Sequence, residues 1–263
     1  MEWILIALVP AFVWSFAALC DKILVSRFVA DGITAGILTN LFSAILIIAL
    51  LPFAPIRELP LNVLLLLLLT GAIWGWNRIS FVKGISLDEA TRVVSIGNMS
   101  PVIILLGSAI LFGEVLKPAD FLAFVLIFAG VMWISIRKTK GVFHWSPALL
   151  WMFISASLFA IMTMLLKYAG MDDWWSALFW INMGFTIGSL PFLAFGPYLS
   201  NVKKAFSKSA LPLISMLFLI NILTLAGRAG YFIALQLGPA AIVSVLASLQ
   251  TALVFILALV LSI

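Results

Sequence analysis

The sequence contains very little metal-binding or redox chemistry. Cys20 is the only cysteine and His144 the only histidine among its 263 residues. A single cysteine cannot form a disulfide within the chain. One cysteine and one histidine cannot supply the ligands of a usual structural zinc cluster. These absences argue against a zinc-dependent membrane protease, and we expect no metal and no cofactor.

Charge is also scarce. Charged residues make up 10% of the chain and hydrophobic residues 65%, and the mean hydropathy is +1.26. So few charged side chains cannot cover a soluble domain of this length. The net charge of +5 comes from basic residues in short loops, which form no nucleic-acid-binding face. The composition therefore predicts an all-α polytopic membrane protein, with the lipid bilayer as a partner and no nucleic acid.

Long apolar runs predict the membrane-spanning helices, because a helix needs roughly 20 apolar residues to cross a bilayer. Nine such segments are present. They are predicted at about Trp3–Leu19, Ile33–Leu51, Asn62–Val82, Val93–Phe112, Phe121–Ile136, Pro147–Leu166, Trp175–Phe195, Leu211–Leu235 and Ala240–Ile263.

Polar residues inside or at the ends of these segments recur at a nearly constant spacing. Arg228 follows Arg78 by 150 residues, Lys167 follows Lys22 by 145, and Asn182 follows Asn40 by 142. We interpret this as an internal repeat. The first unit would cover residues 1–140 with five spans, and the second residues 141–263 with four.

An odd number of spans per unit inserts the second unit upside down relative to the first, as in many secondary transporters. The sequence therefore predicts an inverted repeat of two five-helix units. The tenth helix of that plan is not in the sequence given. Either the chain continues past Ile263 with that helix, or a partner helix or a second copy in a homodimer fills its position.

The first half contains the segment FVKGISLDEATRVVSI at residues 81–96, Pro101, LFGE ending at Glu114, Gly130 and, at the end of the first predicted span, Lys22. In these features it resembles the EamA-like branch of the drug/metabolite transporter superfamily. The resemblance is weaker in the second half, where Thr251 replaces the proline. The resemblance implies a ten-helix fold of two inverted repeats, and alternating-access movement of a small metabolite in the cell (inner) membrane.

Arg78 and Arg228 are the strongest candidates for a binding site, because a charge deep in a span is costly and usually faces a cavity or a partner. No carboxylate lies well inside any predicted span, and Asp21 is placed at the end of the first. We therefore expect the two arginines to lack acidic partners and to bind an anionic or zwitterionic solute rather than a cation. The alternative is that each arginine reaches a nearby interface or bonds to carbonyls of adjacent helices.

Other polar and aromatic side chains in the spans are further candidates for the substrate site: Asn40, Asn182, Trp14, Trp76, Asn77 and Asn98. The asparagines could instead bond helix to helix, which is common between spans.

Taken together, the sequence predicts a secondary transporter of a small metabolite and no enzyme activity. Two alternatives remain open. One is a membrane helper or scaffold subunit that does not transport, and the other is a membrane enzyme acting on lipid-linked substrates.

Overall fold

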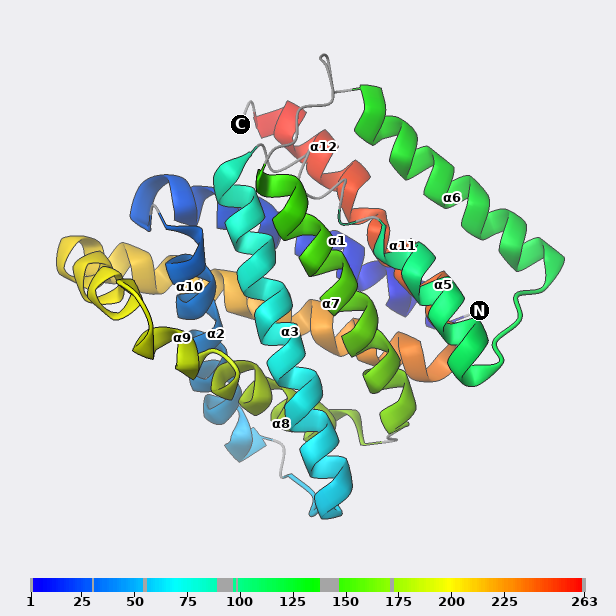
Figure 1. The fold of residues 1–263 in the computed structure, drawn as a ribbon, viewed down its shortest axis with the longest axis horizontal. Coiled ribbons are helices and arrows are strands. Elements are labelled where there is room, and N and C mark those ends of the chain that lie inside the picture. The colour runs from blue at the N-terminus through cyan, green and yellow to red at the C-terminus, as the bar shows by residue number, and fades with distance from the viewer. Residues whose placement is uncertain are drawn as a thin grey trace.

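The computed structural model describes residues 2–29, 31–53, 56–88, 97, 99–137, 147–170 and 173–261, and within these ranges the regular secondary structure is helical. Figure 1 shows the helices, which are α1 (Glu2–Ile23), the π-helical turn η1 (Leu24–Phe28), α2 (Gly32–Ala49), the 3-10 turn η2 (Leu51–Phe53), α3 (Leu61–Leu87), α5 (Ser100–Phe112), α6 (Pro118–Arg137), α7 (Pro147–Ala169), α8 (Trp174–Ile187), α9 (Leu190–Ala194), α10 (Tyr198–Leu237), α11 (Ala240–Ser248) and α12 (Gln250–Leu261).

In the described part of the chain, seven helical segments are long and apolar enough to cross a membrane. They coincide with the first three and the last four predicted spans. The other two predicted spans overlap α5, which has 13 residues, and α6, which has 20. Part of the fourth predicted span lies outside the described residues, so the count of nine spans and the division into five and four stay predictions.

The first span is longer than predicted. We expected it to end near Leu19, before Asp21 and Lys22, but the helix runs without interruption from Trp3 to Phe28. The reason is that both charged side chains have partners on α3. Asp21 pairs with Arg78, and Lys22 Nζ donates to the carbonyl oxygens of Ile85 and Asp88 at 3.1 and 2.8 Å. A charge that is paired inside the bundle does not end a helix.

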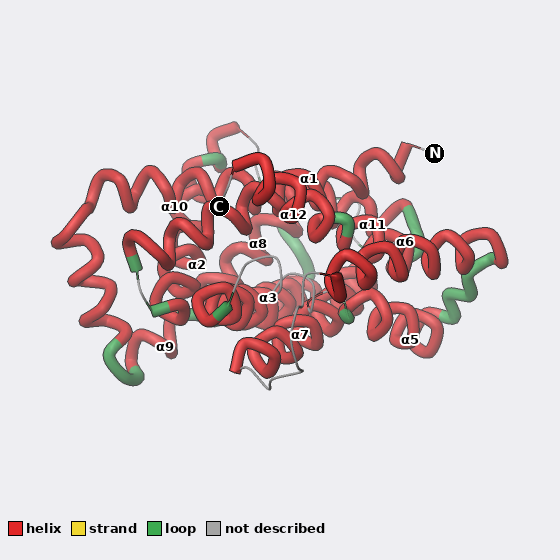
Figure 2. Tube along the Cα trace, turned by 90° about the horizontal axis from the view of Figure 1, so that it is seen from above, coloured by secondary structure: helices red, strands yellow, loops and turns green. Residues whose placement is uncertain are grey.

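The helices form two groups that face each other. α3 packs against α2, α7 and α8, whereas α1 packs against α10, α11 and α12. Figure 2 shows α1 and α12 on one side of the molecule and α3 and α7 on the other. α5 contacts α7 and α11, and α6 lies at the periphery beside α11 and α12 (Figure 1). The space between the two groups holds the cavity described below.

Glycines bring α3 and α8 into unusually close contact. A Cβ atom placed on Gly71 of α3 would lie 2.1 Å from the Ile181 carbonyl oxygen, and one on Gly184 of α8 would lie 2.1 Å from the Leu68 carbonyl oxygen. Each helix has a second glycine four residues on, at Gly75 and Gly188. Small residues at this spacing let two membrane helices approach until their backbones touch. This contact joins helices from the two predicted repeat units.

Two lysines make matching contacts in the two halves of the chain. Lys22, near the end of α1, donates to Ile85 and Asp88 where α3 ends. Lys167, near the end of α7, donates to the carbonyl oxygens of Leu235 and Gly238 where α10 ends, at 2.9 and 2.8 Å. Ile85 and Leu235 are 150 residues apart in the sequence, and so are Asp88 and Gly238. An ammonium at this place satisfies carbonyls that have no partner within their own helix.

We predict that Gly184→Ala lowers the stability of the protein by about 3 kcal/mol, the upper end of the usual cost of overpacking. The added methyl group meets backbone atoms of α3, which cannot rotate away as a side chain can. Gly130→Ala is the matched control, because a Cβ at Gly130 has nothing within 4 Å, and it should change stability by no more than about 1 kcal/mol. Unfolding of the purified proteins in detergent measures both, and equal stabilities would contradict the close contact.

Candidate functional site

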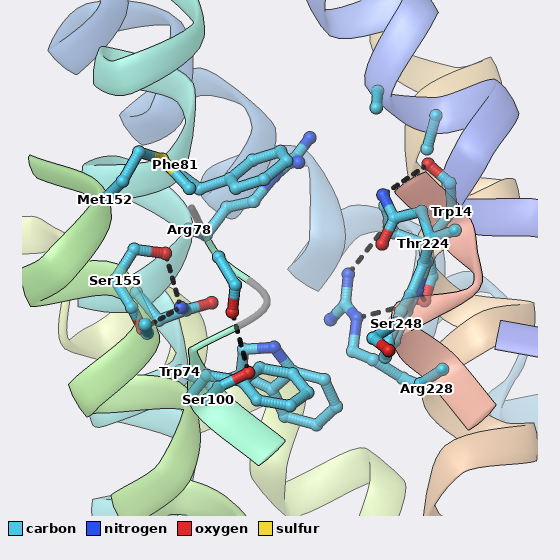
Figure 3. Close-up of a pocket in the computed structure, with 18 of the residues that line it drawn as sticks. Trp14, Trp74, Arg78, Phe81, Ser100, Met152, Ser155, Thr224, Arg228 and Ser248 are labelled. Atoms are coloured by element: carbon cyan, nitrogen blue, oxygen red, sulfur yellow. Dashed lines mark hydrogen bonds between the residues drawn. The ribbon is translucent and has the colours of Figure 1, made fainter. Parts of the chain in front are cut away.

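A cavity of about 130 Å³ lies between the two groups of helices. Its described lining includes three charged residues, Asp21, Arg78 and Arg228. The aromatic residues of the described lining are Trp14, Trp74, Phe81, Phe159 and Phe185. The hydroxyl groups in the lining are those of Ser100, Ser155, Thr224, Ser244 and Ser248. Figure 3 shows Arg78 near Phe81 and Met152, and Arg228 at a separate place on the wall near Thr224 and Ser248.

Arg78 forms a two-point ion pair with Asp21. Its two terminal nitrogens donate to the two carboxylate oxygens at 2.7 and 2.6 Å. The Asp21 side chain is fully buried and that of Arg78 is 11% exposed. The planar guanidinium matches a carboxylate in this geometry. Our prediction that Arg78 has no acidic partner is therefore wrong. It failed because we treated Asp21 as the end of a span, whereas α1 continues and carries Asp21 into the bundle.

Arg228 is more deeply buried than Arg78 and is bound by neutral groups. Its guanidinium donates to Asn182 Oδ1, to Ser43 Oγ at 3.1 Å and to Thr224 Oγ1 at 3.1 Å, and its Nε donates to the Thr224 carbonyl oxygen at 3.3 Å. It also lies over the ring of Phe185, 4.5 Å from the ring centroid. Within the described ranges no ion pair of Arg228 is found. The charge of Arg228 is thus stabilised by dipoles and a π face but is not neutralised.

Two more of the predicted site residues line the cavity. Asn77 directly precedes Arg78 on α3, and its amide donates to the carbonyl oxygen and hydroxyl of Ser155 on α7 at 2.7 and 2.8 Å. Trp14 packs edge-on against Phe159 and also contacts Tyr231. Its carbonyl oxygen accepts a hydrogen bond from Gln250 at 3.1 Å.

Asn40 and Asn182 are fully buried but are not among the cavity-lining residues. Asn40 donates to the Gly75 carbonyl oxygen and to Ser189 Oγ, and so connects α2, α3 and the end of α8. Asn182 accepts from both Ser43 and Arg228. The repeat-related asparagines therefore have different neighbours. Asn182 positions an arginine of the cavity, whereas Asn40 bonds helix to helix.

The other two predicted site residues are not brought to the cavity. Trp76 is 41% exposed, and its indole nitrogen donates to the Gly188 carbonyl oxygen at 2.8 Å, which ties α3 to α8 outside the cavity. Asn98 lies outside the described residues.

Sequence reasoning missed several residues that line the cavity or hold its arginines. Asp21, Ser43, Thr224 and Phe185 are the clearest examples. Thr224 had a signal, because it precedes Arg228 by one helical turn and so lies on the same face. Ser43 and Phe185 come from α2 and α8, far from Arg228 in sequence, and carry no such signal.

Comparisons with known proteins give two findings. A family model described as "EamA-like transporter family" matches residues 1–136. Among solved structures, a chain described as "Crystal structure of protein" matches with a TM-score of 0.68 and 17% sequence identity, over 100% of this chain and 90% of that chain. At that identity the likeness concerns the fold alone. No curated protein matches.

We predict that Asp21→Ala destabilises the protein by about 3–5 kcal/mol, because it leaves the buried Arg78 without a counter-charge. The double variant Asp21→Leu/Arg78→Met should recover most of that loss, since it replaces a buried ion pair by apolar side chains of similar volume. Chemical denaturation in detergent tests both. If the single variant were as stable as the wild type, the ion pair would contribute nothing to the fold.

Proposed function

Because the chain belongs to the EamA-like transporter family, a family of multi-pass membrane proteins, we propose that it is a secondary transporter of a small anionic or zwitterionic solute that works by alternating access. Family membership supports transport in general. The substrate class and the mechanism rest on the arguments that follow.

The observation that carries the substrate class is the charge of Arg228. The described lining of the cavity holds two arginines and one aspartate, which gives a net charge of +1. Asp21 neutralises Arg78, so the surplus charge belongs to Arg228. A buried charge of this kind is stabilised further by an opposite charge, and a carboxylate, sulfonate or phosphate supplies one. A cation would meet repulsion in the same place.

The aromatic rings indicate what the rest of the solute contacts. Trp14 and Phe159 lie side by side in the lining, and Trp74 and Phe185 lie next to the guanidinium of Arg228. A site of this composition accepts an apolar or planar body and orients it by one charged group. We therefore propose a solute with a single acidic group on a body that can stack against rings.

Alternating access follows from the proposed inverted repeat of residues 1–140 and 141–263. The matched contacts of Lys22 and Lys167 support the repeat, because each lysine binds the end of the corresponding helix in its own half. The cavity is lined by helices of both halves, as expected for a site at a repeat interface. Movement of one unit against the other would then open the cavity to each side in turn.

Several further points belong to the same proposal. We place the protein in the cell (inner) membrane and assign it no enzyme activity. A partner helix or second copy beside α12 stays a prediction, as do the helper-subunit and membrane-enzyme alternatives. Ile256, Leu259 and Val260 of α12 are all more than half exposed, so an apolar surface is present where such a helix would pack.

We predict that Arg228→Gln lowers uptake of a fixed-charge anion by at least 100-fold and that Arg228→Lys retains part of the activity. The glutamine removes the surplus charge, whereas lysine keeps a charge without the planar fork of arginine. The measurement is solute exchange in proteoliposomes with three ring compounds: benzenesulfonate as anion, L-phenylalanine as zwitterion and phenyltrimethylammonium as cation. These compounds differ in charge and share a ring.

Arg27→Gln is the matched control, because Arg27 is an exposed arginine at the end of η1 and is not part of the cavity lining. It should exchange benzenesulfonate as the wild type does. Exchange of the cation alone, or normal exchange by Arg228→Gln, would contradict the proposed substrate class.

A further inference from the structure

The two arginines of the cavity differ in whether they already have a counter-charge, and the proposed function uses only the one that has none. Arg228 has neutral partners, and an arriving anion adds the charge that it lacks. Arg78 already holds a carboxylate, and that carboxylate lines the same cavity. An anion that enters therefore finds one arginine without a counter-charge and one that is occupied by Asp21.

Asp21 depends on Arg78 for its negative charge. Its side chain is fully buried, so water cannot stabilise the carboxylate. The titratable groups on the helices packed around it are few. On α1 these are Cys20 and Lys22, and Lys22 is bonded to carbonyl oxygens at the end of α3. On α3 they are Arg78 and Lys83, and Lys83 pairs with Asp31.

The remaining neighbours of α1 add little charge near Asp21. Arg27 of η1 is exposed, and α11 and α12 have no titratable side chain. Two titratable groups lie in the apolar span of α10: Tyr231, which bonds to Thr163, and Arg228, which is held by neutral partners. The others precede that span, and they are Tyr198, Lys203, Lys204 and Lys208. Among the described residues, Arg78 is thus the one cation that forms an ion pair with Asp21.

Both guanidinium groups line this small cavity, so an acidic group bound there is attracted by both. It competes with Asp21 for Arg78, and two anionic groups close together disfavour each other's charge where one of them is fully buried. The solute has a second cation, Arg228, that holds it in place, whereas Asp21 has none. Asp21 is therefore the group that becomes neutral, by taking up a proton.

We propose, building on the function above, that Asp21 is a proton-binding site coupled to the solute through Arg78, so that one proton moves with each anion. In the empty cavity Asp21 is ionised and paired with Arg78. When the anion binds, a proton from the adjacent solution joins a carboxylate oxygen of Asp21, and Arg78 turns to the anion. Release of the anion on the other side reverses both steps, and the net charge moved is zero.

The test is the number of protons taken up when benzenesulfonate binds to the purified protein. A sulfonate stays ionised near neutral pH and carries no proton of its own, so any proton taken up is bound by the protein. Calorimetry in buffers of different ionisation enthalpy should give about one proton per bound anion. Because binding takes up a proton, affinity should fall as pH rises, by up to tenfold per pH unit while Asp21 is ionised in the empty protein.

Asp21→Asn separates proton coupling from anion binding. Asparagine resembles the protonated aspartate and cannot take up a proton, so the benzenesulfonate that this variant binds should be bound with no proton uptake and no pH dependence. The variant should also fail to accumulate the anion in proteoliposomes under an inward proton gradient, which the wild type does. Asp120→Asn removes a carboxylate near the start of α6, away from the cavity, and should keep the coupling of the wild type.

Each outcome decides one of the two proposals. Binding of benzenesulfonate with no proton uptake by the wild type overturns the role of Asp21 and leaves the proposed function in place. Failure of both benzenesulfonate and L-phenylalanine to bind overturns the proposed function and the coupling with it. If Asp21→Asn does not fold, the proton number of the wild type still decides the matter.

Discussion

The arrangement of this protein depends on how charge is held between apolar helices. In a bilayer each buried polar group must find its partner inside the protein, and an unpaired charge costs several kcal/mol. The chain meets this constraint in three ways. Arg78 pairs with a carboxylate, Arg228 is surrounded by neutral dipoles and rings, and Lys22 and Lys167 bind the free carbonyls at helix ends. Of these side chains, only Arg228 keeps a charge in the cavity that an arriving solute can neutralise.

Close helix contact makes these pairings possible. The glycines of α3 and α8 bring two backbones together, which places Phe185 of α8 beside Trp74 and Arg228 at the cavity wall. A larger residue at Gly71 or Gly184 would push the helices apart. The charge network and the packing of small residues are therefore two parts of one arrangement. A change in helix packing far from Arg228 is expected to alter how Arg228 is held.

Hydropathy and spacing predicted much of the fold, because both act along the chain. Long apolar runs located seven segments that the structure also describes as long enough to span a membrane, and a constant spacing linked Arg78 to Arg228 and Lys22 to Lys167. Asp21 was misplaced because hydropathy cannot distinguish a charge that ends a helix from one that is paired within it. Trp76 was misplaced because the side of α3 that faces the cavity is set by its neighbours, and the composition of α3 does not indicate that side. The neutral partners of Arg228 come from α2 and α8 as well as from its own helix, so only the folded chain brings them together.

The central claim is that the surplus positive charge of Arg228 selects the solute, and replacing Asn182 by aspartate tests it most directly. Asn182 touches Arg228 without being among the residues that line the cavity, and aspartate has nearly the same shape. The new carboxylate would neutralise Arg228 and bring the net charge of the described lining and its partner to zero. The measurement is binding of benzenesulfonate to purified Asn182→Asp and wild-type protein at the same pH. The account predicts at least a 100-fold loss of affinity in the variant. Unchanged affinity would show that the charge of Arg228 does not select the solute.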